Sequence, residues 1–484
     1  MNKFRPVHVL AFTLGISAFL IGLSFVSPKE GWEVAGIKLD FMTSENLLFP
    51  KKKIKKDITD LVADVDIEIA GEYEPIKHKN NSDGKMGAPI KINYKINAST
   101  TVFLTEKSQI QLTDFFNKLK NLASEKGKMR VLHFGDSQIE GDRMTSFIRQ
   151  RMQEQFGGNG PGLIPANNVY PTISYYQTFS ENFKRYTCFG GDKLESKKYG
   201  LINSVARFSL EKSDSTDTVV KKAWIDIKPS DKIYSMARQY KIVKMHYNSA
   251  TVPCYLRVFK SGTLIHEEPL KVDSLAHTIS LVFNETPPEL RFEFEGVKSP
   301  NISSFSLEGD YGLQVDNIGM RGSSGTFMGK INRPLFAKML RDEKVGMIIM
   351  QFGGNSMPNL MDSVNVRNYA SYIRGQLRTI QNLAPGIPIV FIGPSDMSML
   401  NDGVYETYPL LPYCVDELKN AILSIGASYW DLYSAMGGYN SMPAWVEKGM
   451  AGADHIHFSN KGASVAAQLF YDAFMGAYTK LESK

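Results

Sequence analysis

Residues 131–137, with the sequence VLHFGDS, place the strongest constraint on the fold. Val131, Leu132 and Phe134 form the short apolar run that is typical of a buried parallel strand. Beyond Ser137, apolar residues recur at spacings of three and four, which predicts a helix through Met144, Phe147, Ile148, Met152 and Phe156. Ser137 therefore lies where a strand turns into a helix, and open α/β sheets bind their ligands at such strand ends. Taken alone, the Gly-Asp-Ser sequence also fits an ordinary loop.

A similar alternation of strand and helix fills the C-terminal part of the chain. An amphipathic pattern predicts a helix over residues 112–122, just before the first strand. Later apolar runs predict strands at residues 313–318, 346–352, 387–392 and 427–432. Helical spacing predicts helices at residues 326–340, 366–383, 413–425 and 460–478. Strands that alternate with helices imply a parallel sheet with helices on both faces, so the fold class is α/β.

Residues 165–309 follow a different pattern, in which short runs of β-branched and aromatic residues alternate with polar ones. These runs predict strands at residues 224–227, 240–243, 254–259, 278–283 and 290–294. Short strands separated by turns favour an all-β sandwich, inserted here into the α/β domain. We expect the aromatic residues Trp224 and Tyr255 to belong to its core rather than to a sugar-binding platform.

The N-terminus carries Lys3 and Arg5 followed by an apolar run over residues 9–26. That run is just long enough to cross a bilayer as a helix, although a cleaved signal peptide is a competing interpretation. We favour an uncleaved anchor, because Ser24 and the residues around it make a poor cleavage site. The positive-inside rule then leaves the body of the protein outside the cytoplasm. Residues 28–99 are expected to be a membrane-proximal spacer, with a possible strand at 62–69 and a flexible linker at 77–87.

Charge and cysteine content exclude several classes of protein. The net charge of +6 over 484 residues is small and does not indicate a nucleic-acid partner. Part of that charge lies in one lysine run, at Lys51, Lys52, Lys53, Lys55 and Lys56. The three cysteines show neither metal-binding spacing nor a disulfide framework, so we expect buried thiols at Cys188, Cys254 and Cys414.

Further polar motifs follow or lie beyond the later strands, and their residue types suit acyl transfer. Ser137 needs a base to become a nucleophile, His457 can be that base, and Asp454 can orient its imidazole. The N–H groups of Ser137 and Gly322 and the side-chain amide of Asn355 can stabilise the oxyanion. Because parallel strands end at one edge of a sheet, these residues can meet despite their separation in sequence.

Each of these residues also has a simpler interpretation. Gly322 and Asn355 are common turn residues. The cluster of Asp454, His455 and His457 contains metal-ligand types, but no further His or Cys completes a site. His455 is also an alternative base or a surface residue. Two other residues stand apart from the catalytic set: a structural role is expected for His133, and a solvated position, or contact with an anionic substrate group, for Arg321.

Taken together, the motifs Gly135-Asp136-Ser137-Gln138, Gly322, Gly353-Gly354-Asn355 and Asp454-His455-Ile456-His457 resemble those of the SGNH, or GDSL-type, hydrolase superfamily. The resemblance covers roughly residues 100–165 and 310–484. It implies a flavodoxin-like three-layer α/β/α fold, a triad of Ser137, Asp454 and His457, and an oxyanion hole of Ser137, Gly322 and Asn355. The sequence departs from the family at Gln138, where leucine is usual, and at Ser356 and Phe458. None of these changes removes a catalytic group.

The first block is most similar to that of bacterial peptidoglycan O-acetylesterases and O-acetyltransferases. This resemblance implies a membrane-anchored serine esterase that removes acetyl groups from a cell-envelope glycan on the periplasmic or extracytoplasmic side. Alternatives are an O-acetyltransferase, a lipase or thioesterase, and a non-catalytic glycan-binding protein. No metal or organic cofactor is implied. The expected organisation is an anchor at 1–27, a spacer at 28–99, the catalytic domain at 100–164 and 310–484, and a carbohydrate-binding-like β-sandwich at 165–309.

Overall fold

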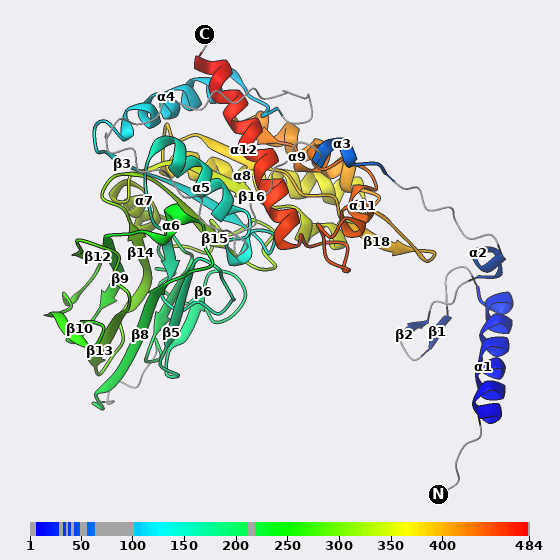
Figure 1. Cartoon of the computed structure of the whole chain (residues 1–484), viewed down its shortest axis with the longest axis horizontal. Helices are drawn as coiled ribbons and strands as arrows, with labels where there is room; N and C mark the ends of the chain where they lie inside the picture. Colours follow the sequence, from blue (N-terminus) through cyan, green and yellow to red (C-terminus); the bar gives the residue numbers. More distant parts are fainter. Residues whose placement is uncertain are drawn as a thin grey trace, which may run out of the picture.

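A computed structural model describes residues 6–28, 32–34, 37–39, 43–48, 56–62, 101–211 and 218–482 of the chain (Figure 1). Three sequence-based expectations fall wholly or mostly outside these residues: the linker at 77–87, the strand at 62–69 and the lysine run, of which only Lys56 is included. Val62, the first residue of that expected strand, is instead the last residue of the short helix α3 (Thr59–Val62).

The centre of the molecule is a five-stranded parallel sheet in the order β15-β3-β16-β17-β20. Its strands are β3 (Lys128–Gly135), β15 (Gly312–Gly319), β16 (Val345–Gln351), β17 (Ile389–Ile392) and β20 (Ser428–Trp430). Numbered along the chain, this is the flavodoxin-like order 2-1-3-4-5, whose ligands bind near the switch point beside the first strand. Ser137 follows that first strand, β3.

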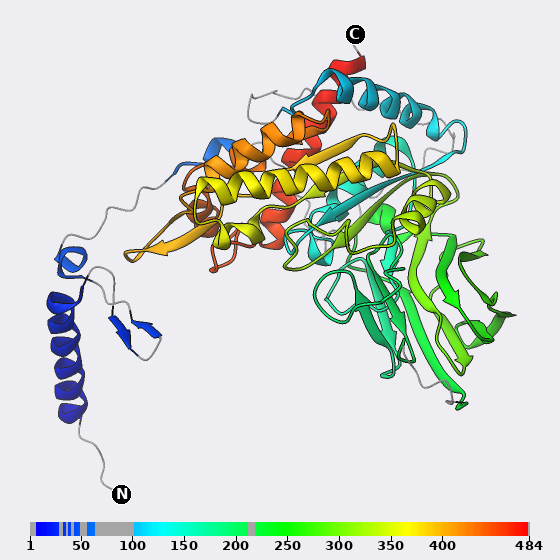
Figure 2. The same ribbon diagram turned by 180° about the vertical axis from the view of Figure 1, so that it is seen from behind.

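Helices cover both faces of this sheet, which confirms the three-layer α/β/α class. Figure 1 shows one group in front, and Figure 2 shows the other from behind. The first group is α4 (Glu106–Leu122), α5 (Thr145–Phe156) and α12 (Asn460–Glu482). The second group is α7 (Arg333–Asp342), α8 (Ser363–Leu383) and α9 (Leu411–Leu423). Successive residues of β3 pack into the two layers, with Val131 in the first core and Leu132 in the second.

The helix expected at 326–340 was wrong at its start, because α7 begins only at Arg333. Asn332 caps this helix by accepting a hydrogen bond from the N–H of Leu335 at 3.0 Å, and Pro334 occupies its first turn. A capping residue followed by proline is a strong helix start. It outweighs the apolar residues that precede it, such as Phe327 and Met328.

A β-sandwich lies between β3 and β15 in the sequence and forms the lower left of Figure 1. One sheet has the order β11-β10-β13-β8-β5, and the other has the order β12-β9-β14-β7-β6, with β4 also paired to β14. The first sheet contains β5 (Tyr175–Phe179), β8 (Lys221–Pro229), β10 (Cys254–Lys260), β11 (Thr263–Pro269) and β13 (Leu290–Gly296). The second contains β4 (Gly162–Pro165), β6 (Lys184–Thr187), β7 (Ser204–Arg207), β9 (Ile242–Ala250), β12 (Asp273–Val282) and β14 (Asn301–Glu308), and a short helix α6 (Ser235–Arg238) precedes β9.

The expectation that Trp224 and Tyr255 belong to the sandwich core was wrong. Tyr255 is 48% exposed, because alternation along β10 turns Cys254 and Leu256 inward and Tyr255 outward. Trp224 is half-buried, and the guanidinium of Arg291 lies 4.5 Å from the centre of its ring. The three cysteines are buried, as expected.

A buried ionic network joins the sandwich to the parallel sheet. Arg130 on β3 contacts Asp316 on β15 at 2.7 Å and also binds Glu308 on β14 of the sandwich. Lys244 on β9 binds the same Glu308 at 3.1 Å and Glu343, beyond α7, at 3.0 Å. Removing one member would leave an opposite charge buried without compensation, so the network fixes how the two units meet.

The N-terminal helix α1 (Pro6–Val26) contains a 20-residue segment, Val7–Val26, with a mean hydropathy of 2.3. By length and composition it could cross a membrane, and a signal sequence would pass the same test. It is followed by the small hairpin β1 (Trp32–Val34) and β2 (Ile37–Leu39) and by α2 (Ser44–Leu48).

Part of the expected spacer packs onto the α/β unit. Ile58 is only 1% exposed and belongs to the core on the α12 side of the sheet. Its neighbour Thr59 accepts a hydrogen bond from Lys448 Nζ at 3.0 Å, just beyond α11 (Ser441–Glu447). The spacer therefore contains a docked segment, which its sequence did not suggest.

Candidate active site

The loop after β3 presents Ser137 at the edge of the sheet. Gly135 is the last residue of the strand, where a Cβ would lie 2.8 Å from the Ile139 side chain, so only glycine fits without a shift. Asp136 Oδ1 then accepts the N–H of Gln138 at 2.9 Å, which closes a turn around the serine. Ser137 itself is half-buried.

The loop of residues 454–457 carries the second half of the site. Asp454 Oδ1 accepts the N–H groups of Ile456 at 3.0 Å and His457 at 3.1 Å. Its other oxygen, Oδ2, lies 2.8 Å from His457 Nδ1. Partial burial raises the pKa of Asp454, but the hydrogen bonds from the side chain and backbone of His457 outweigh it and hold that pKa below its usual range. The carboxylate is therefore ionised at neutral pH.

His457 joins the two loops, because its Nε2 lies 2.9 Å from Ser137 Oγ. With Nδ1 donating to the Asp454 carboxylate, Nε2 is the atom that can accept the serine proton. Residues that are 320 positions apart in the chain thus form a continuous Ser–His–Asp relay. This arrangement can activate a hydroxyl for attack on an acyl carbon.

The expected oxyanion donors lie on loops that contact one another. Met320 donates its N–H to Gly135 O at 2.8 Å, and Asn355 Nδ2 donates to Ser323 O at 3.2 Å. These two bonds tie the loop that contains Gly322 to β3 and to the loop after β16. Among the described residues, the N–H groups of Ser137 and Gly322 have no acceptor. The Asn355 amide also interacts with the carboxyl of Asp136, and this hydrogen bond acts to lower the pKa of that carboxyl.

Comparison with solved structures identifies this architecture. A structure titled as a peptidoglycan O-acetylesterase in action superposes with a TM-score of 0.60, at 19% identity, over 79% of this chain and 99% of that one. A family two carbohydrate esterase from Clostridium thermocellum, at 8% identity, covers 56% of this chain and 96% of its own with a TM-score of 0.23. An acetyl xylan esterase, at 10% identity, covers 33% of this chain and 81% of its own with a TM-score of 0.25. The chain has the SGNH hydrolase fold. No protein-family model and no curated protein matches the sequence.

Two side chains that the sequence analysis did not single out for a role hold together the loops that carry Ser137 and His457. Gln138 Nε2 donates to Ile456 O at 2.7 Å, and its Oε1 accepts the N–H of Phe458 at 3.2 Å. One side-chain amide thus forms hydrogen bonds to the backbone on both sides of His457. Arg143 also bridges the loops, because its guanidinium donates to Ser137 O and, at 2.9 Å, to Phe458 O. The departure from leucine at Gln138 is therefore a structural feature of this site.

Asp136, the middle residue of the Gly-Asp-Ser turn, is also part of the site. Burial raises the pKa of its carboxyl to about 6, against the lowering effects of the Gln138 N–H, His457 and the Asn355 amide. The carboxyl thus lies among the groups that carry the proposed chemistry. The sequence signal for it was the turn itself, to which no separate role was assigned.

The remaining candidates lie as follows. His133 is fully buried between Gln351 at 3.1 Å and Thr145 at 3.0 Å, and burial lowers its pKa to about 3, so its expected structural role is confirmed. His455 has its ring stacked on Tyr405 with 3.6 Å between centroids, so the geometry favours His457 as the base. Among the described residues there is no group of three His, Cys, Asp or Glu that could hold a metal.

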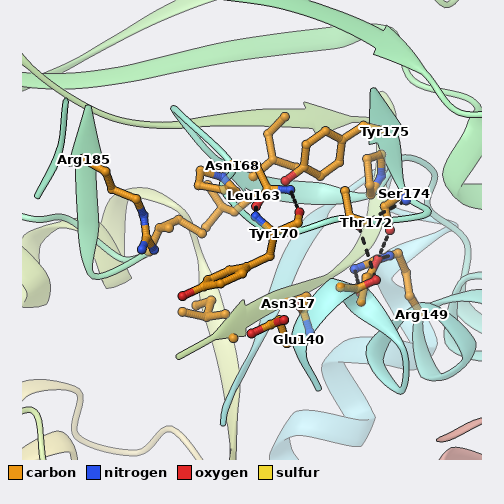
Figure 3. A pocket seen from close by; sticks show the side chains of 18 residues that line it. Glu140, Arg149, Leu163, Asn168, Tyr170, Thr172, Ser174, Tyr175, Arg185 and Asn317 are labelled. Atoms are coloured by element: carbon orange, nitrogen blue, oxygen red, sulfur yellow. Dashed lines mark hydrogen bonds and ion pairs between the residues drawn. The ribbon is translucent and has the colours of Figure 1, made fainter. Parts of the chain in front are cut away.

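A cavity lies beside the serine loop, between the SGNH unit and the sandwich (Figure 3). Glu140 lines it, and the carboxylate of Glu140 is bound by the exposed Arg321, whose Nε lies 2.7 Å from Glu140 Oε2. Arg321 also stacks over Tyr170, with 4.6 Å between the guanidinium and the ring centre. Arg321 is therefore exposed, as expected, and both residues that it contacts here, Glu140 and Tyr170, line this cavity.

Proposed function

We propose that this chain is a serine esterase that removes acetyl groups from a cell-envelope glycan. The observation that carries the proposal is the relay from Asp454 through His457 to Ser137, with distances of 2.8 and 2.9 Å. The SGNH fold, the likeness to a peptidoglycan O-acetylesterase structure and the apolar helix α1 are consistent with it. The helix supports a place at the cytoplasmic membrane with the catalytic unit on the extracytoplasmic side.

In the proposed reaction, Ser137 Oγ attacks the acetyl carbonyl carbon while His457 Nε2 takes the hydroxyl proton. The negative charge that develops on the carbonyl oxygen is stabilised by the N–H groups of Ser137 and Gly322 and by the Asn355 amide. Collapse of the intermediate breaks the ester bond, and the imidazolium returns its proton to the sugar oxygen. Water then attacks the acetyl-enzyme by the same route, which releases acetate and restores Ser137.

Transfer of the acetyl group to a second sugar is the second candidate function. It differs only in the second step, in which a sugar hydroxyl replaces water as the acceptor. A lipase or thioesterase is a third candidate, and a preference for long acyl chains on model esters would indicate it.

The test is acetate release by the detergent-solubilised full chain from an activated acetyl ester and from O-acetylated peptidoglycan. We expect Ser137→Ala to lower the rate on both by at least about 10⁴-fold, because the nucleophile is lost. Ser424→Ala, which alters an exposed serine on the far end of α9, is the matched control and should retain full activity.

The two substrates separate the alternatives. Release from both substrates that vanishes in Ser137→Ala establishes deacetylation. Release from the activated ester alone, rising when sugar acceptors are added, favours the transferase. The catalytic proposal is wrong if no Ser137-dependent release occurs from either, and a glycan-binding role then remains.

A further inference from the structure

The cavity beside the serine loop carries a charge that the proposed catalytic steps do not use. Its wall includes two carboxylates that are already engaged: Glu140 is bound by Arg321, and Asp142 accepts two hydrogen bonds from Arg149, at 2.6 and 3.1 Å. Ser174 also donates to Asp142. These pairs occupy both carboxylates. Glu140 acts on the nearby Arg185 only at a distance: burial lowers the pKa of the Arg185 guanidinium, and the charge of Glu140 partly opposes that shift.

Arg185, on strand β6, is a charged residue of the cavity wall that is not part of these pairs. Its side chain reaches from the sandwich towards Tyr170 across the cavity (Figure 3). Among the described residues it has no hydrogen-bond or ion-pair partner, and its Nε is buried without an acceptor. The contact that it makes is with the Tyr170 ring, whose centre lies 6.0 Å from the guanidinium. A buried guanidinium N–H with no acceptor, as at Arg185 Nε, is costly unless a ligand supplies one.

The cavity lies next to the loop that carries Ser137, and its lining begins at Glu140 of that loop. Its wall includes Gly319, which pairs in register with Gly135 on β3, two residues before Ser137. Glu140 is three residues beyond Ser137, and Arg143 donates to the carbonyl groups of both. A group bound in the cavity and an ester bound at Ser137 can therefore come from one molecule only if that group and that ester lie close together in the molecule.

The size of the cavity limits what can enter. Its volume is about 60 Å³, which is room for about four to six water molecules. A carboxylate fits in such a space, whereas a whole sugar ring does not. A guanidinium fork is well matched to a carboxylate, because two parallel N–H groups can bind its two oxygens.

We propose that this cavity is a subsite for a carboxylate borne by the sugar that carries the acetyl group, or by its immediate neighbour, with Arg185 as the counter-ion. The inference rests on the proposed function, which supplies the acetylated glycan. It narrows the substrate class to anionic glycans. Such a carboxylate can come from an acidic substituent of peptidoglycan or from a uronic acid residue.

The experiment uses the full chain with Arg185→Gln, and with Arg378→Gln as the control for loss of one exposed arginine charge. Substrates are O-acetylated peptidoglycan, the same material with its carboxyl groups amidated, acetylated polygalacturonate and neutral acetylated xylan. We expect Arg185→Gln to raise KM for the carboxylate-bearing substrate by about tenfold or more, with kcat little changed. Amidation of the peptidoglycan carboxyl groups should raise the KM of the wild type by a similar factor and leave the KM of Arg185→Gln unchanged. Arg185→Lys should recover part of the loss.

The two glycans with carboxylates distinguish the source of the acid. A dependence on Arg185 with peptidoglycan alone identifies its acidic substituents, and one with polygalacturonate alone identifies a uronic acid. The subsite is disproved if Arg185→Gln behaves like Arg378→Gln on every substrate, or if the loss is equally large on amidated peptidoglycan.

Failure of the proposed function is recognised separately. If no substrate is deacetylated, co-sedimentation of the Ser137→Ala chain with native and amidated peptidoglycan still tests the subsite. The carboxylate site is supported if more of the Ser137→Ala chain sediments with native than with amidated peptidoglycan, and if the additional change Arg185→Gln removes this difference. Equal sedimentation in all four combinations rejects it.

Discussion

The two loops that bear the proposed catalytic residues are held in different ways. Ser137 follows β3, which pairs with β15 on one side and with β16 on the other. Strand pairing therefore determines where the serine loop begins, and the side chains of Asp136 and Arg143 hold the turn around the serine. The loop of residues 454–457 lies between α11 and α12, outside the sheet, and is held by Asp454 from within and by Gln138 and Arg143 from outside. The base thus lacks the strand pairing that places the nucleophile, and its loop depends on these side chains together with backbone bonds such as the one from Ser398 N–H to His455 O at 3.0 Å.

The strongest test of this difference is Asp454→Asn. An amide cannot stabilise the imidazolium of His457 and permits the wrong tautomer, so we expect kcat to fall by about 10³–10⁴-fold. The backbone of the Ser137 loop should keep its position, because β15 and β16 pair with β3 and the side chains of Asp136 and Arg143 hold the turn that follows it. Acetate release and thermal unfolding are the measurements, with Asp416→Asn on an exposed part of α9 as the control. A loss below about tenfold would contradict the role of Asp454.

Asn355 extends the comparison to a third loop, which follows β16 and so is fixed by the sheet as Ser137 is. Asn355→Ala removes one proposed oxyanion donor, and we expect kcat to fall by about 10²–10³-fold with little change in KM. Steady-state kinetics on the activated ester measure both constants. Asn365→Ala, at the first turn of α8, is the matched control. An effect confined to KM would show that Asn355 binds the ground state instead.

The smallest of the three effects is expected for Gln138→Leu, which restores the residue usual in the family. It deletes both hydrogen bonds to the backbone around His457 and leaves Ile456 O and Phe458 N without them. A cost of about 1–3 kcal/mol in the placement of the loop corresponds to a fall in kcat of about 5–150-fold.

The control for this change is Gln381→Leu, which removes a side-chain hydrogen bond to Ile425 O far from the site. Both variants should unfold at similar temperatures, and only Gln138→Leu should lose activity. Unchanged kcat in Gln138→Leu would mean that the 454–457 loop keeps its place without the amide, and the contrast between the two loops would be weaker than described.

The same contrast explains what could be predicted from the sequence. Strands β3, β15, β16, β17 and β20 were predicted because buried strands leave continuous apolar runs, and Ser137 because it follows one of them. The contacts of Gln138 and Arg143 were not, because they join residues more than 300 positions apart and leave no local pattern. For the same reason the position of Arg185 at a cavity could not be predicted from the sequence. The misplaced start of α7 reflects a local signal, the Asn332 cap, that was outweighed by apolar spacing.

The docking of Ile58 has a consequence for distance. The chain between the end of α1 at Val26 and Ile58 comprises about 32 residues, which can extend to at most about 110 Å. With α1 in a bilayer, the docked segment of the esterase could move at most that distance from the anchor. The length of chain between residues 62 and 101 would not change this limit. Loss of the Ile58 contact would lengthen the chain segment that connects the enzyme to the membrane, so that the enzyme could reach glycan strands farther from the membrane. The contacts of Ile58, Leu61 and Thr59 would therefore limit how far the enzyme can move from the membrane.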